Sequence, residues 1–510
     1  MKLVKRLIQQ AIHARLWLFC VIVGLALPAA AAEANPRLNI VFLLADDLGW
    51  SDLSCYGSTF YETPNLDRMA REGGRFTQAY AACPVCSPTR ASLLTGRYPQ
   101  RTGVTDFIGA TQPDKWNRNT RLLPAAYRER LELEEGTVAK GFKAHGYATF
   151  FAGKWHLGPE GFWPENQGFD INKGGIDRGG PYGGNKYFSP YGNPRLEDGP
   201  PGEHLPDRIA TETAKFIQAN KECPFLAWVP FYDVHTPLMA RADLRKKYEE
   251  KARAVKHAGP DWGKEGEREV RLVQDHAVYG GMVEAMDQAV GKILKALEEN
   301  GMAQHTLVLF SSDNGGLSTS EGHPTSNLPL RGGKGWLYEG GIREPLIVRW
   351  PGVVKAGAVF DSVVSSPDIF PTLLEAAGWP LLPKQHLDGV SFVPVLQGQA
   401  RARGPVYWHY PHYGNQGGFP GGAVRDGDWK LIEHYEDGAV ELYNLREDIS
   451  ESRNLAAAAP ERVKELQSKL AAWRTEVGAR MPTPNAKYDP NAPRPKQKRA
   501  VKNARLSSSE

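Results

Sequence analysis

Four short apolar runs of the sequence each end at polar side chains that could do chemistry. In chain order these side chains are Asp46 and Asp47, Lys154 and His156, His235, and Asp313 with Asn314. Any one of these clusters has a structural explanation, such as a helix cap or a surface charge. Ligands of open α/β sheets bind outside the carboxyl ends of the strands. We therefore expect all four clusters to lie along one edge of a single sheet.

The acidic and amide members of this set are suited to a metal ion. They are Asp46, Asp47, Asp313 and Asn314. Carboxylate and amide oxygens without imidazole or thiolate favour Ca²⁺ or Mg²⁺ over zinc. A cluster of carboxylates also needs nearby positive charge if it is to remain ionised. The sequence therefore predicts a hard divalent cation at this edge.

Cationic and histidine side chains accompany these acidic residues. They are Arg90, Lys154 and Lys334, with Arg331 as a further candidate, together with His156 and His235. A metal ion flanked by Lys, Arg and His neutralises an anionic tetrahedral ester and the charge that develops on its leaving oxygen. The residues predict sulfuryl or phosphoryl transfer and leave the choice between the two open.

The elements that must position these residues are those of an α/β domain with a large, mostly parallel sheet between helices. The predicted strands are Ile40–Ala45, Tyr147–Ala152, Pro224–Phe231, Thr306–Ser311 and Pro345–Val348. Helices are predicted from Pro64, capped by Thr63, from Asp207 to Asn220, and from about Arg268 to Glu299. Ser87 and Pro88 favour a helix start, which places Cys86 just before a positive helix end.

The character of the sequence changes after about Gly404. Short antiparallel strands are predicted at Ala423–Ile432 and Ala439–Asn444, followed by an amphipathic helix from Pro460 to Val477. We expect a catalytic domain at 33–403, a small C-terminal α+β subdomain at 404–483 and a disordered basic tail at 484–510. The long Gly- and Pro-rich stretches are expected to be either functional loops or disordered. His409 to Tyr413 lies in one of them and either lines a sugar pocket or packs beneath the loop.

The start of the chain indicates export. Lys2, Lys5, Arg6 and Arg15 precede an apolar stretch from Leu16 to Leu27, and a run of small residues follows to Ala32. The stretch is shorter than the about 20 apolar residues of a membrane-spanning helix, which favours a signal peptide at 1–32 over an anchor. The expected location is periplasmic or extracellular, without a stable membrane span.

Charge and cysteine content exclude other classes of protein. Residues 1–32 hold four basic and no acidic side chains, so this segment alone carries the formal charge of +4. The rest of the chain has no basic excess, and no nucleic-acid partner is expected. Cys83 and Cys86 form a C-x-x-C pair, but a second pair and a nearby His pair are missing. Neither a zinc site nor a disulfide scaffold is predicted.

Two runs of the sequence resemble the signatures of the formylglycine-dependent, arylsulfatase-like sulfatases of the alkaline phosphatase superfamily. Cys86-Ser87-Pro88-Thr89-Arg90 followed by Leu93-Leu94-Thr95-Gly96-Arg97 is similar to the core Cys-x-Pro-x-Arg and the Leu-Leu-Thr-Gly-Arg after it. Gly153-Lys154-Trp155-His156 is similar to the end of the second signature. The segments around Asp46, Asp313 and Lys334 are similar to family segments in the same order. The resemblance covers about residues 37–480.

The resemblance implies an alkaline-phosphatase-like fold, one bound Ca²⁺ and a formylglycine made from Cys86 by a maturation enzyme. The implied Ca²⁺ ligands are Asp46, Asp47, Asp313, Asn314 and the modified Cys86. The implied catalytic residues are Cys86, Arg90, Lys154, His156, His235 and Lys334. His235 is placed by the segment Val234-His235-Thr236-Pro237, which is similar to the family's His-x-Pro.

The mechanism expected from the resemblance agrees with elementary chemistry. A thiolate at Cys86 would leave an adduct with no internal route of release, whereas an aldehyde hydrate attacks with one hydroxyl and keeps the second in reserve. His235 and Lys334 would assist the leaving oxygen, and His156 would take the proton of the second hydroxyl. Arg90 and Lys154 would hold the hydrate and the sulfate oxygens.

Export and long loops favour a sulfated glycan as the substrate. A phosphate or phosphonate monoester hydrolase of the same fold remains an alternative, because the same cations suit either anion. A non-catalytic protein that binds sulfated glycans is a second alternative, which applies if Cys86 is not converted.

Overall fold

The first strand of the central sheet, β1 (Asn39–Ala45), has all of its residues buried. Its side chains alternate between two separate cores, as expected for a strand covered on both faces. Val41, Leu43 and Ala45 lie in one core, and Ile40, Phe42 and Leu44 lie in the other. The computed structural model describes residues 37–401 and 403–492. The predicted signal peptide and residues 493–510 of the predicted tail lie outside these described residues.

The central sheet has nine strands in the order β11-β2-β10-β9-β1-β6-β4-β5, with β12 paired to β2. β10 runs antiparallel to β9 and β2, whereas the other neighbours run parallel. The other eight strands are β2 (Gly74–Tyr80), β4 (Ala148–Ala152), β5 (Ile171–Lys173), β6 (Phe225–Pro230), β9 (Thr306–Ser312), β10 (Arg343–Arg349), β11 (Ala358–Phe360) and β12 (Val364–Ser365). The predicted fold class and the five predicted strands are confirmed.

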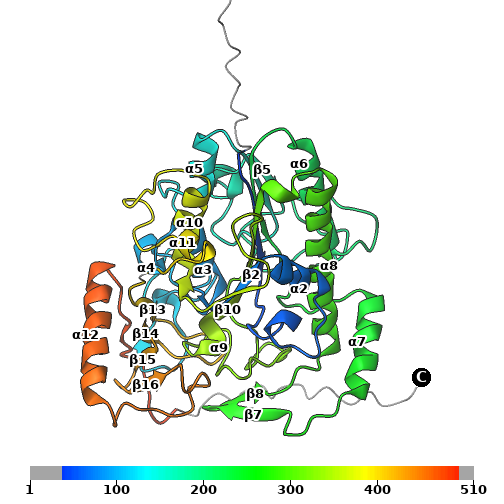
Figure 1. Cartoon of the computed structure of the whole chain (residues 1–510). Coiled ribbons are helices and arrows are strands. Elements are labelled where there is room, and N and C mark those ends of the chain that lie inside the picture. The colour runs from blue at the N-terminus through cyan, green and yellow to red at the C-terminus, as the bar shows by residue number, and fades with distance from the viewer. Residues whose placement is uncertain (1–36, 402, 493–510) are drawn as a thin grey trace, which may run out of the picture. The chain divides into compact units, whose positions relative to one another are not determined.

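Helices cover both faces of this sheet (Figure 1). One core lies under α2 (Pro64–Glu72), α6 (Leu205–Ala219), α7 (Ala242–Ala254) and α8 (Ala277–Glu299). The other lies under α3 (Cys86–Thr95), α5 (Val138–Ala144), α10 (Ile369–Ala376) and α11 (Val393–Leu396). Two short helices, α4 (Pro99–Thr102) and α9 (Glu339–Ile342), lie in connections. Among the described residues, every helix is too short or too polar to cross a membrane.

A second sheet follows towards the C-terminus, as predicted. It contains β13 (Val406–Tyr410), β14 (Gly421–Asp426), β15 (Trp429–His434) and β16 (Val440–Asn444), each antiparallel to the next. The helix α12 (Pro460–Glu476) packs Leu466, Leu470 and Trp473 against it. Two small pairings complete the strands: β3 (Leu122–Leu123) with β17 (Thr483–Pro484), and β7 (Trp262–Glu265) with β8 (Arg268–Arg271).

The structure corrects one predicted helix and one predicted strand. The helix predicted from Arg268 begins only at Ala277, where the His276 ring accepts from the Tyr279 amide. Arg268 instead begins β8, because Gly266 at φ 55° closes a hairpin with β7. The strand predicted over Ala423–Ile432 is likewise two strands, β14 and β15, joined at Gly427 with φ 60°.

The helix start near the first signature also differs from the prediction. Cys86 is the first residue of α3, and Val85 is its N-cap, so Cys86 lies within the first turn. Ser87 does not cap the helix. Its Oγ instead accepts from the amide of Ile108 at 3.1 Å, because the loop carrying Ile108 packs directly on this turn.

Candidate active site

Two of the carboxylates at the carboxyl edge of the sheet are held by Lys154 and Arg90. Lys154, beyond β4, donates from Nζ to both oxygens of Asp46 at 2.9 and 2.7 Å. Arg90, on α3, donates from Nε to Asp313 Oδ2 at 2.8 Å, and its Nη2 lies 3.5 Å from Asp46 Oδ1. The predicted convergence of separate strand ends is therefore present in the structure.

Asp47 is paired with a cation from a different part of the chain. Lys334, in the loop before α9, donates from Nζ to Asp47 Oδ2 at 2.7 Å. Asn314 Nδ2 donates to Asp47 Oδ1 at 2.8 Å, and His235 Nε2 lies 3.8 Å from Oδ2. Burial alone would raise the pKa of Asp47, but the charge and hydrogen bond of Lys334 hold that pKa below its ordinary value. Asp47 is therefore ionised.

A group of donor atoms suited to a metal ion lies between these pairs. One ligand atom each from Asp46, Asp47 and His235 lies within 4.8 Å of the others, and all three residues are buried. Asn314 Oδ1 is buried without a hydrogen-bond partner among the described residues. Burial raises the pKa of Asp46 well above its ordinary value, so this carboxylate needs further positive charge to remain ionised. The group could hold a divalent cation, with His235 nearer to it than the sequence indicates.

Cys86 and His156 form the second part of the site. Cys86 Sγ lies 3.4 Å from His156 Nδ1, and His156 Nε2 lies 2.9 Å from the carbonyl oxygen of Ile108. A carbonyl only accepts hydrogen bonds, so Nε2 carries the proton and Nδ1 presents its lone pair to Cys86. Burial and the charge of Lys154 lower the pKa of His156 to about 3. His156 is thus a neutral base directed at Cys86.

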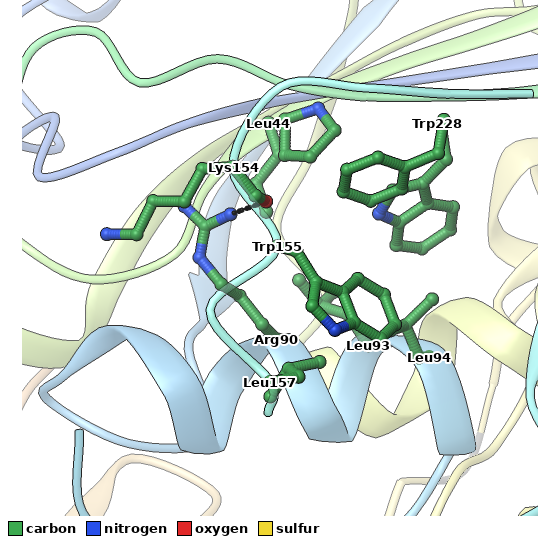
Figure 2. Close-up of a pocket in the computed structure, with 10 residues that line it drawn as sticks. Leu44, Arg90, Leu93, Leu94, Lys154, Trp155, Leu157 and Trp228 are labelled. Carbon is green, nitrogen blue, oxygen red and sulfur yellow. Dashed lines mark hydrogen bonds between the residues drawn. The ribbon is translucent and has the colours of Figure 1, made fainter. Parts of the chain in front are cut away.

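Arg90 and Lys154 are backed by apolar side chains. Both residues line a cavity of about 10 Å³ together with Leu93, Leu94, Trp155 and Trp228. Figure 2 shows these side chains. Arg90 Nη1 donates to the carbonyl oxygen of Lys154 at 2.9 Å. The cavity is too small for a substrate, and its apolar lining keeps water away from one side of the two cations. Their charges are therefore screened little.

One predicted cation lies away from the group. Arg331 binds Glu265 through Nε and Nη2 at 2.9 and 2.8 Å, and its guanidinium stacks on Tyr338 at 3.8 Å. Its Nη1 also donates to the Tyr443 hydroxyl and the Glu451 carbonyl oxygen. These partners hold Arg331, although it lies only three residues before Lys334.

The stretch from His409 to Tyr413 is mostly used for packing. His409 bonds the Tyr435 hydroxyl and the Arg480 carbonyl at 2.6 and 2.9 Å. Tyr410 donates to Asp106 at 3.0 Å, and His412 bonds Thr105 at the same distance. These three side chains are buried, whereas Tyr413 is half-buried and available to a ligand.

Sequence reasoning missed three groups at the site. Ile108 acts through its backbone carbonyl oxygen, and any residue type could supply that group. Tyr182 is 48% exposed and its ring lies 6.4 Å from that of His235. The charge of Glu321 helps to raise the pKa of Lys334 and partly opposes the lowering of the His235 pKa by burial. The exposed aromatic ring at Tyr182, in a Gly-rich stretch, was the only available signal.

Comparison with known proteins places the chain in a family. The sequence profile described as Sulfatase matches residues 38–379, and the one described as N-sulphoglucosamine sulphohydrolase, C-terminal, matches residues 333–476. A protein named Sulfatase from Formosa agariphila is 34% identical over 86% of this chain and 89% of its own length. Human arylsulfatase A is 34% identical over 80% of this chain and 76% of its own length.

A solved structure shares the fold over most of both chains. The crystal structure of Ps i-CgsB in complex with k-i-k-neocarrahexaose superimposes with a TM-score of 0.70 at 28% identity, over 86% of this chain and 92% of that chain. The matched profile, the relatives and the fold agree with one another. The chain belongs to the sulfatase family and is a sulfuric ester hydrolase.

Proposed function

We propose that the chain hydrolyses a sulfate ester of a sulfated glycan, with one Ca²⁺ and with Cys86 converted to formylglycine. The observation that carries the proposal is the meeting of Cys86, His156 and three cations around the buried carboxylates of Asp46 and Asp47. The glycan is supported by the structural neighbour in complex with a neocarrahexaose and by the exposed Tyr182 beside His235.

The buried oxygen donors fit Ca²⁺. Asp46, Asp47, Asp313, Asn314 and the modified Cys86 would hold the ion. Asn314 Oδ1 supports this assignment, since it is buried and lacks a hydrogen-bond partner among the described residues. Bound Ca²⁺ would supply positive charge that makes a nearby hydroxyl more acidic and attracts sulfate oxygens.

Formylglycine would replace the thiol of Cys86 by an aldehyde, whose hydrate offers one hydroxyl as nucleophile and a second for release of sulfate. His156 Nδ1 lies 3.4 Å from the Cys86 sulfur and takes a proton from a group at that position. The bond from Nε2 to the Ile108 carbonyl fixes the ring in the required tautomer.

Arg90 and Lys154 provide fixed positive charge for the sulfate oxygens. Arg90 is held from two sides, by the Asp313 carboxylate and by the Lys154 carbonyl oxygen. Such held donors need no rearrangement when negative charge develops on the substrate.

Lys334 and His235 act on the departing alcohol. Burial would lower the pKa of Lys334, but Asp47 and Glu321 raise it well above its ordinary value, so Lys334 remains charged. His235 Nδ1 donates to the Thr236 carbonyl at 2.6 Å, which leaves Nε2 facing the site. Burial lowers the pKa of His235 to about 3, and an anionic ester bound beside it would favour protonation at Nε2.

Export through a signal peptide at 1–32 and conversion of Cys86 by a formylglycine-generating enzyme belong to the same proposal. The test compares kcat/KM for 4-nitrophenyl sulfate and 4-nitrophenyl phosphate, followed by desulfation of a panel of defined sulfated saccharides. We expect the sulfate to be favoured and at least one saccharide to be desulfated. A preference for the phosphate would assign the site to the alternative chemistry.

A further inference from the structure

Two arginines near the site, Arg118 and Arg268, form no ion pair within residues 37–401 and 403–492, and the carboxylate whose charge acts on Arg268 is that of Glu267, its exposed neighbour in the chain. Arg118 donates from Nη1 to the Tyr413 carbonyl oxygen at 2.9 Å. Desolvation of the guanidinium and the charge of Arg268 lower the pKa of Arg118, although the residue as a whole is exposed. Two like charges held close together without a partner are unfavourable unless an anion binds between them.

Aromatic rings hold Arg118 in place. Its guanidinium carbon lies 5.1 Å from the ring centroid of Trp116 and 5.8 Å from that of Tyr413. The two ring centroids are 5.7 Å apart, and the rings are anchored by bonds from Trp116 Nε1 to Thr120 and from the Tyr413 hydroxyl to Glu436. Arg118 is exposed and the two rings are half-buried, so the cluster is open to a ligand.

The side chain of Arg268 lies against Gly417. An added Cβ at Gly417 would lie 2.6 Å from Arg268 Cγ and 2.7 Å from Nε, and Gly417 has φ 102°. A side chain at this position would displace Arg268. Glycine at 417 therefore provides the space that the guanidinium stem of Arg268 occupies.

Short contacts connect this cluster to the leaving-group side of the active site. Gln416, beside Gly417, packs on Gly335, where an added Cβ would lie 2.9 Å from Gln416 Cβ. Gly335 directly follows Lys334 in the chain. Gln416 Nε2 also donates to Glu321 at 2.8 Å, and the charge of Glu321 acts on Lys334. A glycan whose leaving group contacts Lys334 would extend towards Arg268.

We propose that Arg118 and Arg268 form a second anion subsite, which binds another sulfate or a carboxylate of the same glycan while Trp116 and Tyr413 contact its rings. The inference rests on the proposed function, because it assumes that the saccharide occupies the site around Cys86. If the subsite exists, the substrate is a saccharide that carries at least two anionic groups.

The test measures binding without turnover, by calorimetry on the Cys86→Ala chain. The probes are sucrose octasulfate for sulfate groups and oligogalacturonate for carboxylates, with inorganic sulfate as the single anion. The double variant Arg118→Gln/Arg268→Gln should weaken binding of at least one polyanionic probe by about tenfold or more, since hydrogen bonds to charged groups are the strong ones. Inorganic sulfate should be affected far less.

Two further variants keep the test decisive. Arg268→Lys keeps the charge and should retain most of the binding, which distinguishes lost charge from a disturbed hairpin. Arg462→Gln on α12 is the matched control, because Arg462 also lies over an aromatic ring, 5.7 Å from Trp429, but pairs with Glu465. Two results would overturn the subsite. One is a loss of binding in the control variant that equals the loss in the double variant. The other is unchanged binding of both polyanionic probes by the double variant.

Hydrolysis of 4-nitrophenyl sulfate by the wild-type enzyme is measured in parallel. Turnover together with arginine-independent binding would reject the subsite and keep the sulfatase assignment. Absence of turnover in fully converted enzyme with Ca²⁺ would reject the proposed function itself.

Discussion

His156 Nδ1 lies 3.4 Å from Cys86 Sγ, while the opposite nitrogen of the same ring bonds the carbonyl oxygen of Ile108 at 2.9 Å. The ring is therefore held from one side and presents an unprotonated nitrogen on the other. These two contacts connect His156, which follows β4, to the start of α3 and to the loop that carries Ile108. They determine which ring nitrogen can accept a proton.

His156→Asn should lower kcat by about 10²- to 10⁴-fold, the usual contribution of a positioned general base. KM should change little, because Arg90 and Lys154 still hold the anion. Steady-state kinetics on 4-nitrophenyl sulfate measure both constants. His305→Asn is the control, since that residue lies in the short turn before β9. An unchanged kcat in the His156 variant would remove its role as base.

His235→Ala should affect substrates according to their leaving group. An alcohol of high pKa needs a proton as it departs, whereas an activated phenolate does not. A series of aryl and alkyl sulfates gives kcat/KM as a function of leaving-group pKa, and the variant should show the steeper dependence. Equal losses across the whole series would be incompatible with proton donation from His235.

Removal of Ca²⁺ should destabilise the fold as well as abolish activity. Asp46 and Asp313 are fully buried, and the ion would bind only the native state. At 100 times its Kd a ligand of the native state adds about 2.7 kcal/mol. Thermal unfolding in EGTA should occur at lower temperature and recover with added Ca²⁺, and Mg²⁺ should recover less because it demands octahedral geometry. The Asp313→Asn chain is expected to respond more weakly, and identical unfolding with EGTA and Ca²⁺ would argue against the site.

A pH effect on stability is expected away from the active site. Lys430 lies 2.8 Å from Glu451 and 2.9 Å from Glu339, and all three side chains are buried. Burial raises the pKa of Glu451 to about 7; it would also raise that of Glu339, but Lys430 holds that pKa at about 2.

The sign follows from proton binding. Between pH 4.5 and 7 the native state keeps a proton on Glu451 that the unfolded chain has lost, so this group's contribution to stability declines as pH rises through that range. Glu339 stays ionised throughout the range. Chemical denaturation should show this decline in the wild-type chain and less of it in Glu451→Gln, and parallel curves for the two chains would refute the shifted pKa.

The sequence predicts the edge of the sheet well because apolar runs followed by polar clusters depend on local pattern alone. Lys154 pairs with Asp46 as expected from the strand ends, and Arg90 links Asp46 to Asp313. The sequence cannot show which of Arg331 and Lys334 reaches the site. Both are cations close together in the chain, and they differ only in the tertiary partners that they contact. The hairpin that replaces the first turns of the helix predicted from Arg268 is likewise set by tertiary contact, as its bond from Arg271 to the Ser318 carbonyl shows.

Hydrolysis of 4-nitrophenyl sulfate by Cys86→Ala, compared with wild-type enzyme, tests the central claim most directly. The variant replaces the reactive side chain at the start of α3 by a methyl group and leaves the four other proposed Ca²⁺ ligands in place, so the fold should remain and thermal unfolding should change little. We predict that turnover falls to background. Wild-type rates in the Cys86→Ala chain would contradict the account, because the nucleophile would then have to come from elsewhere.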